Sequence, residues 1–383
     1  MTVAEIQSNE ALRQQEFPVT KDRIFLGHAG DCPLPGRVAV AIAKYANDAT
    51  TGDQENSIYP AIIERARELG SRLLGCQPDE VGLVGPTSLA LSLIASGLKF
   101  RRQDNIVVYL DDYPSNVYPW MALASQGVQV RFLNIRNLGV IRPRDVVGQV
   151  DENTRLVALA SCHFVSGYRI DIDAIGKELR RRGIFFCLDA IQTLGAFPTP
   201  TQHVDFLAAD AHKWLLGPCG AGLMYVRKAL QERLTPPIYG WNNVRCPNYV
   251  TQEAINYRSG AHKYEAGTYN LLGMVGLVAA MELILEVGVE AISADLLAKR
   301  GFLVPGLQAK GYTVLQTDAA PDSASGIVTF HKPGADLPAL HAKLSENQVV
   351  TSLRADRSGQ KYIRLSPHFY NTTAELQRLL DLV

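Results

Sequence analysis

A carboxylate and a lysine each follow a short apolar run near the middle of the chain. Asp189 comes directly after the run 184–188, and Lys213 comes four residues after the run 206–209. An uninterrupted apolar run is typical of a strand that is buried on both faces of a parallel sheet. Because ligand sites in open α/β sheets lie beyond the C-terminal ends of the strands, we expect both side chains at such a site.

This pair has the chemistry that pyridoxal 5'-phosphate (PLP) requires. PLP forms a Schiff base with a lysine amine, and a carboxylate beside its ring nitrogen keeps that nitrogen protonated and makes the ring an electron sink. Lys213 and Asp189 would supply these two groups. Each residue alone has an ordinary explanation, since an aspartate after a strand often caps a helix and a lysine there is usually solvated. Their joint context favours a PLP site.

Around these residues the sequence resembles the class V aminotransferase superfamily, fold type I PLP enzymes that include cysteine desulfurases, kynureninases and isopenicillin N epimerase-like proteins. The resemblance rests on Asp189, Ile191 and Gln192, followed by the pair His212-Lys213 and a glycine-rich turn, and it extends over nearly the whole chain. Ile191 is bulkier than the residue usual at its position. The resemblance implies that Asp189 binds the pyridine nitrogen and Gln192 the phenolic oxygen. It also implies that Lys213 binds the aldehyde carbon and that His212 contacts the phosphate.

The segment Gly85 to Ala90 offers hydroxyl groups and backbone amides where a loop enters a predicted helix. A helix N-terminus attracts anions, so Thr87 and Ser88 are candidate phosphate ligands, although either could simply cap the helix. The segment resembles the phosphate turn of the family, but Pro86 removes one amide donor. Tyr113 stands where the family places a side chain that stacks on the pyridine ring, and it could instead pack locally in its proline-containing turn.

The run from Tyr264 to Asn270 resembles a family segment in which a threonine reaches the phosphate of the cofactor in the other subunit. If this carries over, Thr268 completes the site of a partner chain and the protein is a homodimer with shared active sites. Without the resemblance, Gly267 would indicate only a turn and Thr268 a helix cap.

Three residues are candidates for binding an amino acid substrate. Arg364 lies in the run YIRLSPHFYNT, where the resemblance implies an arginine that forks onto the substrate carboxylate. An arginine in an alternating strand is also typical of an exposed surface. Asn116 and His28 are predicted to help shape the pocket, and Asn116 could instead cap a helix.

The sequence indicates the cofactor more clearly than the reaction. Cysteine desulfurases carry a nucleophilic cysteine shortly before the substrate arginine, but residues 347–361 contain no cysteine. Phe164 and Ser161 stand where desulfurases have asparagine and histidine, which favours another branch. We favour an amino-acid aminotransferase, in which Lys213 moves a proton and burial lowers its pKa. The alternatives are a cysteine-independent β-lyase, including a carbon–sulfur lyase, a kynureninase-like hydrolase, an epimerase, and a catalytically silent PLP-fold binding protein.

Composition narrows the class of protein. With 383 residues and 47% hydrophobic content, the chain can bury the cores of a large and a smaller domain. Lysine plus arginine and aspartate plus glutamate both total 38, so neither a nucleic acid nor an anionic membrane is an expected partner.

No apolar stretch has the length of a signal peptide or a membrane span, and we expect a cytoplasmic protein. Six cysteines without a CxxC pair predict reduced thiols, and scattered histidines predict no metal site.

The order of predicted elements indicates the fold class. From 20 to 270, short apolar strands alternate with longer helical segments, which predicts a three-layer α/β/α large domain with a mostly parallel sheet. This PLP-binding domain is followed by a smaller α+β unit, predicted to comprise 1–19 and 271–383. The predicted strands are 106–110, 128–133, 156–160, 184–188, 206–209, one through 224–226, 312–316, 326–331 and 362–366. The predicted helices are 60–74, 89–98, 175–182, 274–287, 291–310, 337–346 and one from 373.

Overall fold

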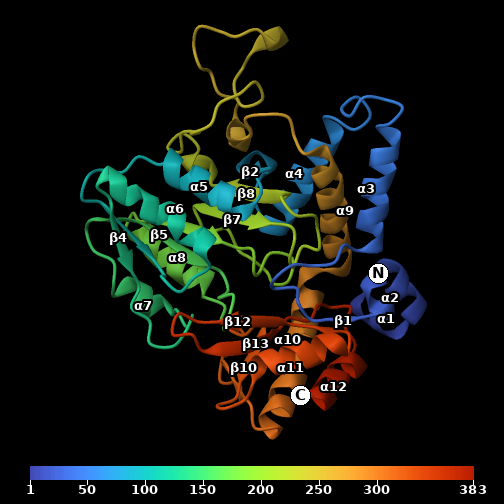
Figure 1. Cartoon of the computed structure of the whole chain (residues 1–383). Helices are drawn as coiled ribbons and strands as arrows, with labels where there is room; N and C mark the ends of the chain where they lie inside the picture. Colours follow the sequence, from blue (N-terminus) through green and yellow to red (C-terminus); the bar gives the residue numbers. More distant parts are fainter.

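The computed structural model describes residues 1–383, and a seven-stranded sheet forms its centre (Figure 1). The strand order is β2-β8-β7-β6-β5-β3-β4, and β8 alone runs against its neighbours. The strands are β2 (Val81–Gly82), β3 (Asn105–Val108), β4 (Gln129–Phe132), β5 (Thr154–Ala160), β6 (Phe185–Asp189), β7 (Phe206–Asp210) and β8 (Gly222–Val226). The predicted mostly parallel α/β fold is therefore confirmed.

Alternating residues of the central strands enter two separate hydrophobic cores, which explains their continuous apolar sequences. On β7, Leu207 and Ala209 join the larger core, whereas Phe206 and Ala208 join the other. The larger core includes residues of α4 (Ala61–Leu74), α8 (Ile172–Arg181) and α9 (Leu271–Val287). The second includes residues of α5 (Thr87–Gly97) and α6 (Tyr118–Met121). Helices thus cover both faces of the sheet and form the predicted three layers.

Strand register brings the chemically important loops to one edge of the sheet. Asp189 is paired with Ala160 of β5 on one side and with Ala208 of β7 on the other. It is the last residue of β6, and Lys213 follows the end of β7 by three residues. Both therefore lie at the C-terminal edge of adjacent parallel strands.

A smaller antiparallel sheet follows in the C-terminal part, in the order β12-β13-β10-β9 (orange and red in Figure 1). Its strands are β9 (Thr313–Val314), β10 (Val328–His331), β12 (Ser352–Ala355) and β13 (Lys361–Leu365). The associated helices α10 (Val289–Ala309), α11 (Leu337–Glu346) and α12 (Thr373–Leu382) contribute to a third core. β1 (Ile24–Phe25) pairs in parallel with β11 (Val349–Val350). β9 is shorter than predicted because Gln316 adopts a left-handed conformation that ends the extended chain.

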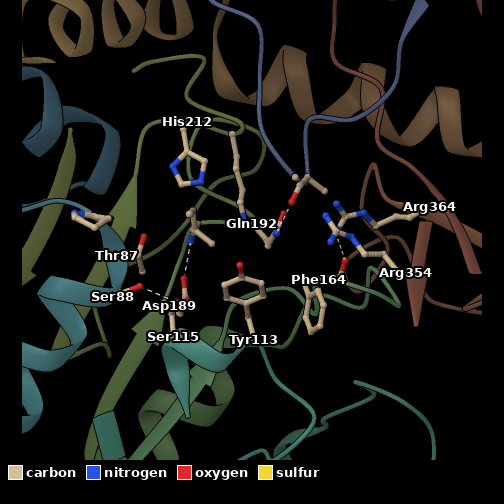
Figure 2. A pocket seen from close by; sticks show the side chains of 15 residues that line it. Thr87, Ser88, Tyr113, Ser115, Phe164, Asp189, Gln192, His212, Arg354 and Arg364 are labelled. Carbon is tan, nitrogen blue, oxygen red and sulfur yellow. Dashed lines mark hydrogen bonds between the residues drawn. The ribbon is translucent and has the colours of Figure 1, made fainter. Parts of the chain in front are cut away.

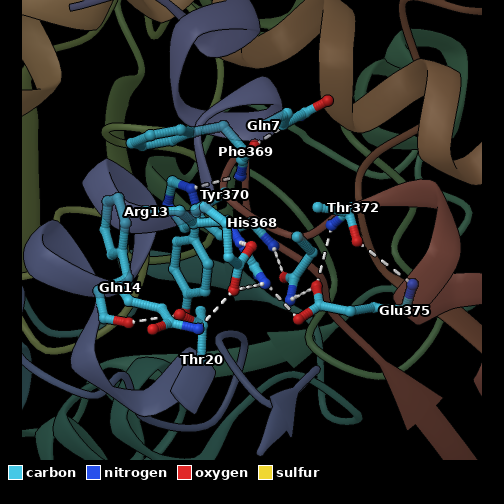
Figure 3. Close-up of polar contacts among 12 residues, drawn as sticks. Gln7, Arg13, Gln14, Thr20, His368, Phe369, Tyr370, Thr372 and Glu375 are labelled. Carbon is cyan, nitrogen blue, oxygen red and sulfur yellow. Dashed lines mark hydrogen bonds and ion pairs between the residues drawn. The ribbon is translucent and has the colours of Figure 1, made fainter.

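The two N-terminal helices, α1 (Val3–Ser8) and α2 (Glu10–Glu16), are bound to the C-terminal part of the chain (Figure 3). The Arg13 guanidinium donates to Glu10 and, over 2.8 Å, to Glu375 at the start of α12. Gln7 Nε2 donates to the Phe369 carbonyl over 2.7 Å. These contacts link residues 1–19 with the C-terminal unit.

The predicted boundary at residue 270 falls directly before α9. This helix packs against α3 (Gly36–Asp48) and α4, both of which belong to the predicted large domain, whereas α10 contacts β9 and β10. The division of the chain into two domains stays a prediction. The remaining short elements are α7 (Pro143–Val147) and 3₁₀ helices at Pro18–Lys21, Pro78–Glu80, Pro114–Asn116, Ala122–Gln126, Lys228–Leu230, Pro247–Tyr249 and Gly260–Tyr264.

No helix taken singly has both the length and the apolar character needed to cross a bilayer. Only α9 and α10 taken together are long and apolar enough, and the two helices are bent by 75° relative to each other. Most residues of α9 are buried against the rest of the protein.

Candidate active site

A cavity of about 160 Å³ lies at the C-terminal edge of the central sheet (Figure 2). Three parts of the chain supply its walls: the loops that follow the parallel strands, an N-terminal loop, and strands β12 and β13. The lining residues are Ala29, Gly30, Pro86, Thr87, Ser88, Tyr113, Ser115, Phe164, Asp189, Ile191, Gln192, His212, Lys213, Arg354 and Arg364. Most of the predicted cofactor residues are therefore brought together.

Asp189 and Lys213 are the buried ionisable pair of this cavity. The Asp189 residue is 2% exposed and accepts a 3.1 Å hydrogen bond from the Ile191 amide. Burial, reinforced by the charge of Asp112, raises the pKa of Asp189 to about 7. Burial lowers the pKa of Lys213 to about 8, and the charge of Asp189 opposes that shift. About a tenth of the Lys213 amine is therefore neutral at pH 7, far more than for an ordinary lysine.

Tyr113 covers the space beside this pair. Its ring centroid lies 5.3 Å from Lys213 Nζ, and the edge of Phe164 approaches the same ring with centroids 5.4 Å apart. Tyr113 is 44% exposed, so its ring borders the opening of the cavity. A flat aromatic ligand held by Asp189 and Lys213 would have this phenol ring within stacking reach.

One end of the cavity has the donors that a phosphate group requires. It lies at the N-terminus of α5, where the amides of Thr87 and Ser88 make no backbone hydrogen bond. Thr87 and Ser88 are the first two residues of that helix, and the Ser88 hydroxyl lies 2.7 Å from that of Ser115. His212 also lines the cavity, and its Nδ1 is bonded to the Asp210 carboxylate, which orients the ring.

Ser115 was not predicted as a site residue, although a hydroxyl two residues after Tyr113 was a usable signal.

Gln192 was predicted, and hydrogen bonds hold both ends of its side-chain amide. Its Nε2 donates to the Ala29 carbonyl over 3.0 Å, and its Oε1 accepts from Trp214 Nε1 over 2.9 Å. One amide hydrogen of Nε2 remains for a ligand in the cavity.

The opposite end of the cavity carries two arginines. Arg364 is 1% exposed, and its Nη1 donates to the Phe164 carbonyl over 2.6 Å. Burial, reinforced by the nearby charge of Arg354, lowers the pKa of Arg364 to about 9. Arg354 was not predicted, because the pairing of β12 with β13 that brings it here joins separate segments of the chain.

Three predicted site residues do not line the cavity. His28 is fully buried beside it, where Nδ1 bonds the Ser366 carbonyl and Nε2 bonds the Tyr370 hydroxyl, so neither nitrogen is available to a substrate. Asn116 is also fully buried. Its side chain donates a hydrogen bond to Asp112 over 3.0 Å and accepts one from Trp120 over 3.3 Å. Both bonds are used within the protein, so Asn116 stabilises the local structure. Thr268 is exposed and lies outside the cavity, so its predicted role in the site of a partner chain stays a prediction.

The arrangement fits PLP. A buried carboxylate, a buried amine, an aromatic cover and an anion-binding helix N-terminus meet in one cavity. Asp189 would hold the ring nitrogen, Lys213 the aldehyde carbon, and Thr87, Ser88 and His212 the phosphate. Together with the α/β fold, this donor set defines the class of fold type I PLP-dependent enzymes.

Comparison with known proteins agrees with this class. The family described as Aminotransferase class-V matches residues 24–379. A probable cysteine desulfurase of Methanothermobacter thermautotrophicus is 28% identical over 96% of this chain and 95% of its own length. The uncharacterized aminotransferase YcbU of Bacillus subtilis is also 28% identical, again over 96% and 95%. The apo structure of a cysteine desulfurase from Thermococcus onnurineus has a TM-score of 0.87 at 23% identity and covers 96% of both chains.

The chain therefore belongs to the class V aminotransferase family. Because this family depends on PLP, the predictions of a PLP-dependent enzyme and of PLP as its cofactor are confirmed.

None of the six cysteines lines the cavity, and the turn between β12 and β13 contains none. No group of three or more His, Cys, Asp or Glu side chains is placed to hold a metal ion.

Proposed function

We propose that the protein is an aminotransferase that exchanges the amino group of an amino acid with a keto acid. The observation that carries this proposal is that Lys213 is the only amine in the cavity and no thiol accompanies it. Bound PLP supplies an electron sink for the charge that develops at the substrate Cα. Proton transfer at that carbon then requires one nearby group that can accept the proton and return it.

Lys213 suits this proton transfer because its pKa of about 8 lies close to physiological pH. Asp189 offers a buried carboxyl group to the ring nitrogen of the cofactor, and Arg364 faces the cavity as the ligand for the substrate carboxylate. Tyr113 and Phe164 restrict the access of water to the same space.

The test is an assay of the PLP-loaded enzyme with L-amino acids and a 2-keto acid acceptor. We expect each amino acid consumed to yield one new amino acid, without release of ammonia. Ammonia or sulfide released without a new amino acid would contradict amino transfer.

A carbon–sulfur lyase is the second candidate, because several relatives are named as probable cysteine desulfurases. Such a lyase would have to work without a protein thiol, since residues 347–361 contain no cysteine. Lys213 could remove the Cα proton in that reaction too. Sulfide release from cysteine or cystine in the same assay would support this candidate.

We also propose a homodimer in which Thr268 serves the partner's site. Thr268 is exposed, and the preceding segment 236–262 extends away from the body of the chain (yellow and gold in Figure 1). That segment exposes apolar side chains, including Tyr239, Tyr249 and Ile255. A dimer by light scattering, together with weaker PLP retention in Thr268→Ala, would support the arrangement, and a monomer with full PLP affinity would contradict it.

A further inference from the structure

Two guanidinium groups converge at the end of the cavity away from Thr87 and Ser88 (Figure 2). Arg364 lies on β13 opposite Ser352 of β12, and Arg354 lies two residues further along β12. Because side chains two residues apart on a strand share a face, both arginines point to the same side of the small sheet. Each places one terminal nitrogen 3.3 Å from the position that a β-carbon on Gly30 would occupy.

Gly30 places only a hydrogen atom in this space, between the Gly27 carbonyl and the two guanidinium groups. Any side chain at residue 30 would fill the same space. The glycine thus allows a ligand to approach both arginines.

The positive charge at this end is not neutralised by the protein. No carboxylate lies within 4.0 Å of a side-chain nitrogen of Arg354 or Arg364, although 23 other ion pairs are formed in the chain. The Nε atoms of both arginines are buried without a hydrogen-bond partner. The Arg354 side chain makes no hydrogen bond, whereas Arg364 uses Nη1 for the Phe164 carbonyl and Nη2 for Ser352. Arg364 is buried and Arg354 is half-buried. An unpaired charge is costly when it is removed from water, which indicates that ligand charge completes this site.

One carboxylate is not enough to balance two guanidinium charges. A single arginine can bind the α-carboxylate of an amino acid through two parallel hydrogen bonds. The second arginine would then keep an unpaired charge beside the amine of Lys213.

We propose that the substrate is an amino acid with a second acidic group on its side chain. Arg364 binds its α-carboxylate and Arg354 binds its side-chain acid. This inference rests on the proposed function only in taking an amino acid as the substrate. In this arrangement Arg354 determines whether the enzyme prefers substrates with acidic or with neutral side chains.

The experiment compares acids with amides of nearly equal shape. Dissociation constants of the PLP-loaded enzyme for L-aspartate and L-asparagine, and for L-glutamate and L-glutamine, are obtained from the change in cofactor absorbance. We expect at least one acid to bind about 10-fold to 100-fold more tightly than its amide. In Arg354→Gln this ratio should fall to about one, and Arg354→Lys should recover part of it. Lys361→Gln, an exposed cation on β13, is the matched control that keeps the ratio.

Two results would overturn the inference. The first is that the wild-type enzyme binds every amide as tightly as its acid. The second is that Arg354→Gln weakens the binding of acid and amide equally, which would mean that both arginines hold the α-carboxylate. Calorimetry with succinate, glutarate and butyrate gives a readout that needs no amino transfer. The wild-type enzyme should bind a dicarboxylate more tightly than butyrate, and Arg354→Gln should lose that difference.

Failure of amino transfer has a separate signature. An enzyme that prefers acidic substrates but releases ammonia contradicts the proposed reaction and supports the role of Arg354. An enzyme that transfers amino groups but does not prefer acidic substrates supports the proposed reaction and contradicts the role of Arg354.

Discussion

Lys213 Nζ lies 5.3 Å from the centroid of the Tyr113 ring, although the two residues follow strands that are not neighbours. Tyr113 comes after β3 and Lys213 after β7, and β5 and β6 lie between these strands in the sheet. The site therefore spans four parallel strands, and its geometry depends on the register of the whole sheet.

Replacement of Lys213 by alanine should abolish the proton transfer at the substrate Cα. We expect Lys213→Ala to reduce amino transfer by about 10²-fold to 10⁴-fold, because it removes the only amine of the cavity. The rate of new amino acid formation measures this effect. Lys99→Ala, at an exposed lysine, should keep the wild-type rate. Full activity in Lys213→Ala would disprove the assigned role.

Replacement of Tyr113 should separate ring stacking from hydroxyl chemistry. Tyr113→Phe keeps an aromatic face beside Lys213, so we expect PLP affinity close to that of the wild type. Tyr113→Ala removes the face and should weaken PLP binding by about tenfold. Equilibrium dialysis of PLP measures both. Equal losses in the two variants would instead assign the binding energy to the hydroxyl group.

The cofactor half of the site could be predicted because each of its signals is local. Asp189 directly follows the apolar run that forms β6, Lys213 comes four residues after the run that forms β7, and Thr87 and Ser88 stand where α5 begins. In parallel sheets such positions meet at one edge whatever the details of packing. The ends of the strands and helices differ by only a few residues from those predicted.

The substrate half depended on contacts between distant segments. Arg354 reaches the cavity through the pairing of β12 with β13, and the sequence SLRA alone did not indicate a strand. His28 was predicted as a pocket residue from its loop, but the bonds that bury it come from Ser366 and Tyr370, more than 300 residues away. Burial and partner choice of this kind arise only from the folded chain.

Uptake of PLP by the apoprotein should depend on pH through the Asp189–Lys213 pair. The neutral amine of Lys213 is its reactive form and gains population as the pH rises through about 8. The carboxylate of Asp189 forms as the pH rises through about 7. We therefore expect faster uptake at pH 8.5 than at pH 6.5, followed by absorbance. In Asp189→Asn a single step should remain, and it should lie below pH 8 because the variant lacks the charge that raises the pKa of Lys213. A rate that falls with rising pH would contradict both assignments.

The buried ion pair of Arg67 and Glu265 should stabilise the region that carries Thr268. Arg67 Nη1 donates to Glu265 Oε1 over 2.8 Å, and Glu265 also accepts from the Leu83 amide over 2.6 Å. The two side chains are only 9% and 2% exposed. Arg67→Met leaves the Glu265 carboxylate buried and unpaired, so we expect a loss of about 3–5 kcal/mol in the free energy of unfolding.

Urea denaturation measures this loss, and a double variant tests its origin. Arg67→Met combined with Glu265→Gln removes the unpaired charge and should be less destabilised than Arg67→Met alone. A single variant within 0.5 kcal/mol of the wild type would show that the pair contributes little.

Protonation of His28 should destabilise the protein below about pH 6.5. Burial lowers the pKa of His28 to about 4 in the folded state, compared with 6.5 for an ordinary histidine. Between these values the unfolded chain binds a proton that the folded chain does not, so the free energy of unfolding falls as the pH decreases. The loss reaches about 3 kcal/mol by pH 4, and the effect is absent above the unfolded pKa.

The variant His28→Gln should show a smaller loss of stability over the same range, measured as the pH dependence of the unfolding midpoint. His368, which is also fully buried with a lowered pKa, leaves some dependence in place. Tyr370→Phe is the matched control, because it removes the hydroxyl that donates to His28 Nε2 and keeps the titrating ring. It should lower stability at every pH and retain the slope between pH 4 and 6.5. If His28→Gln kept the full slope, the pH dependence would have to arise from other groups, and His28 would contribute packing alone.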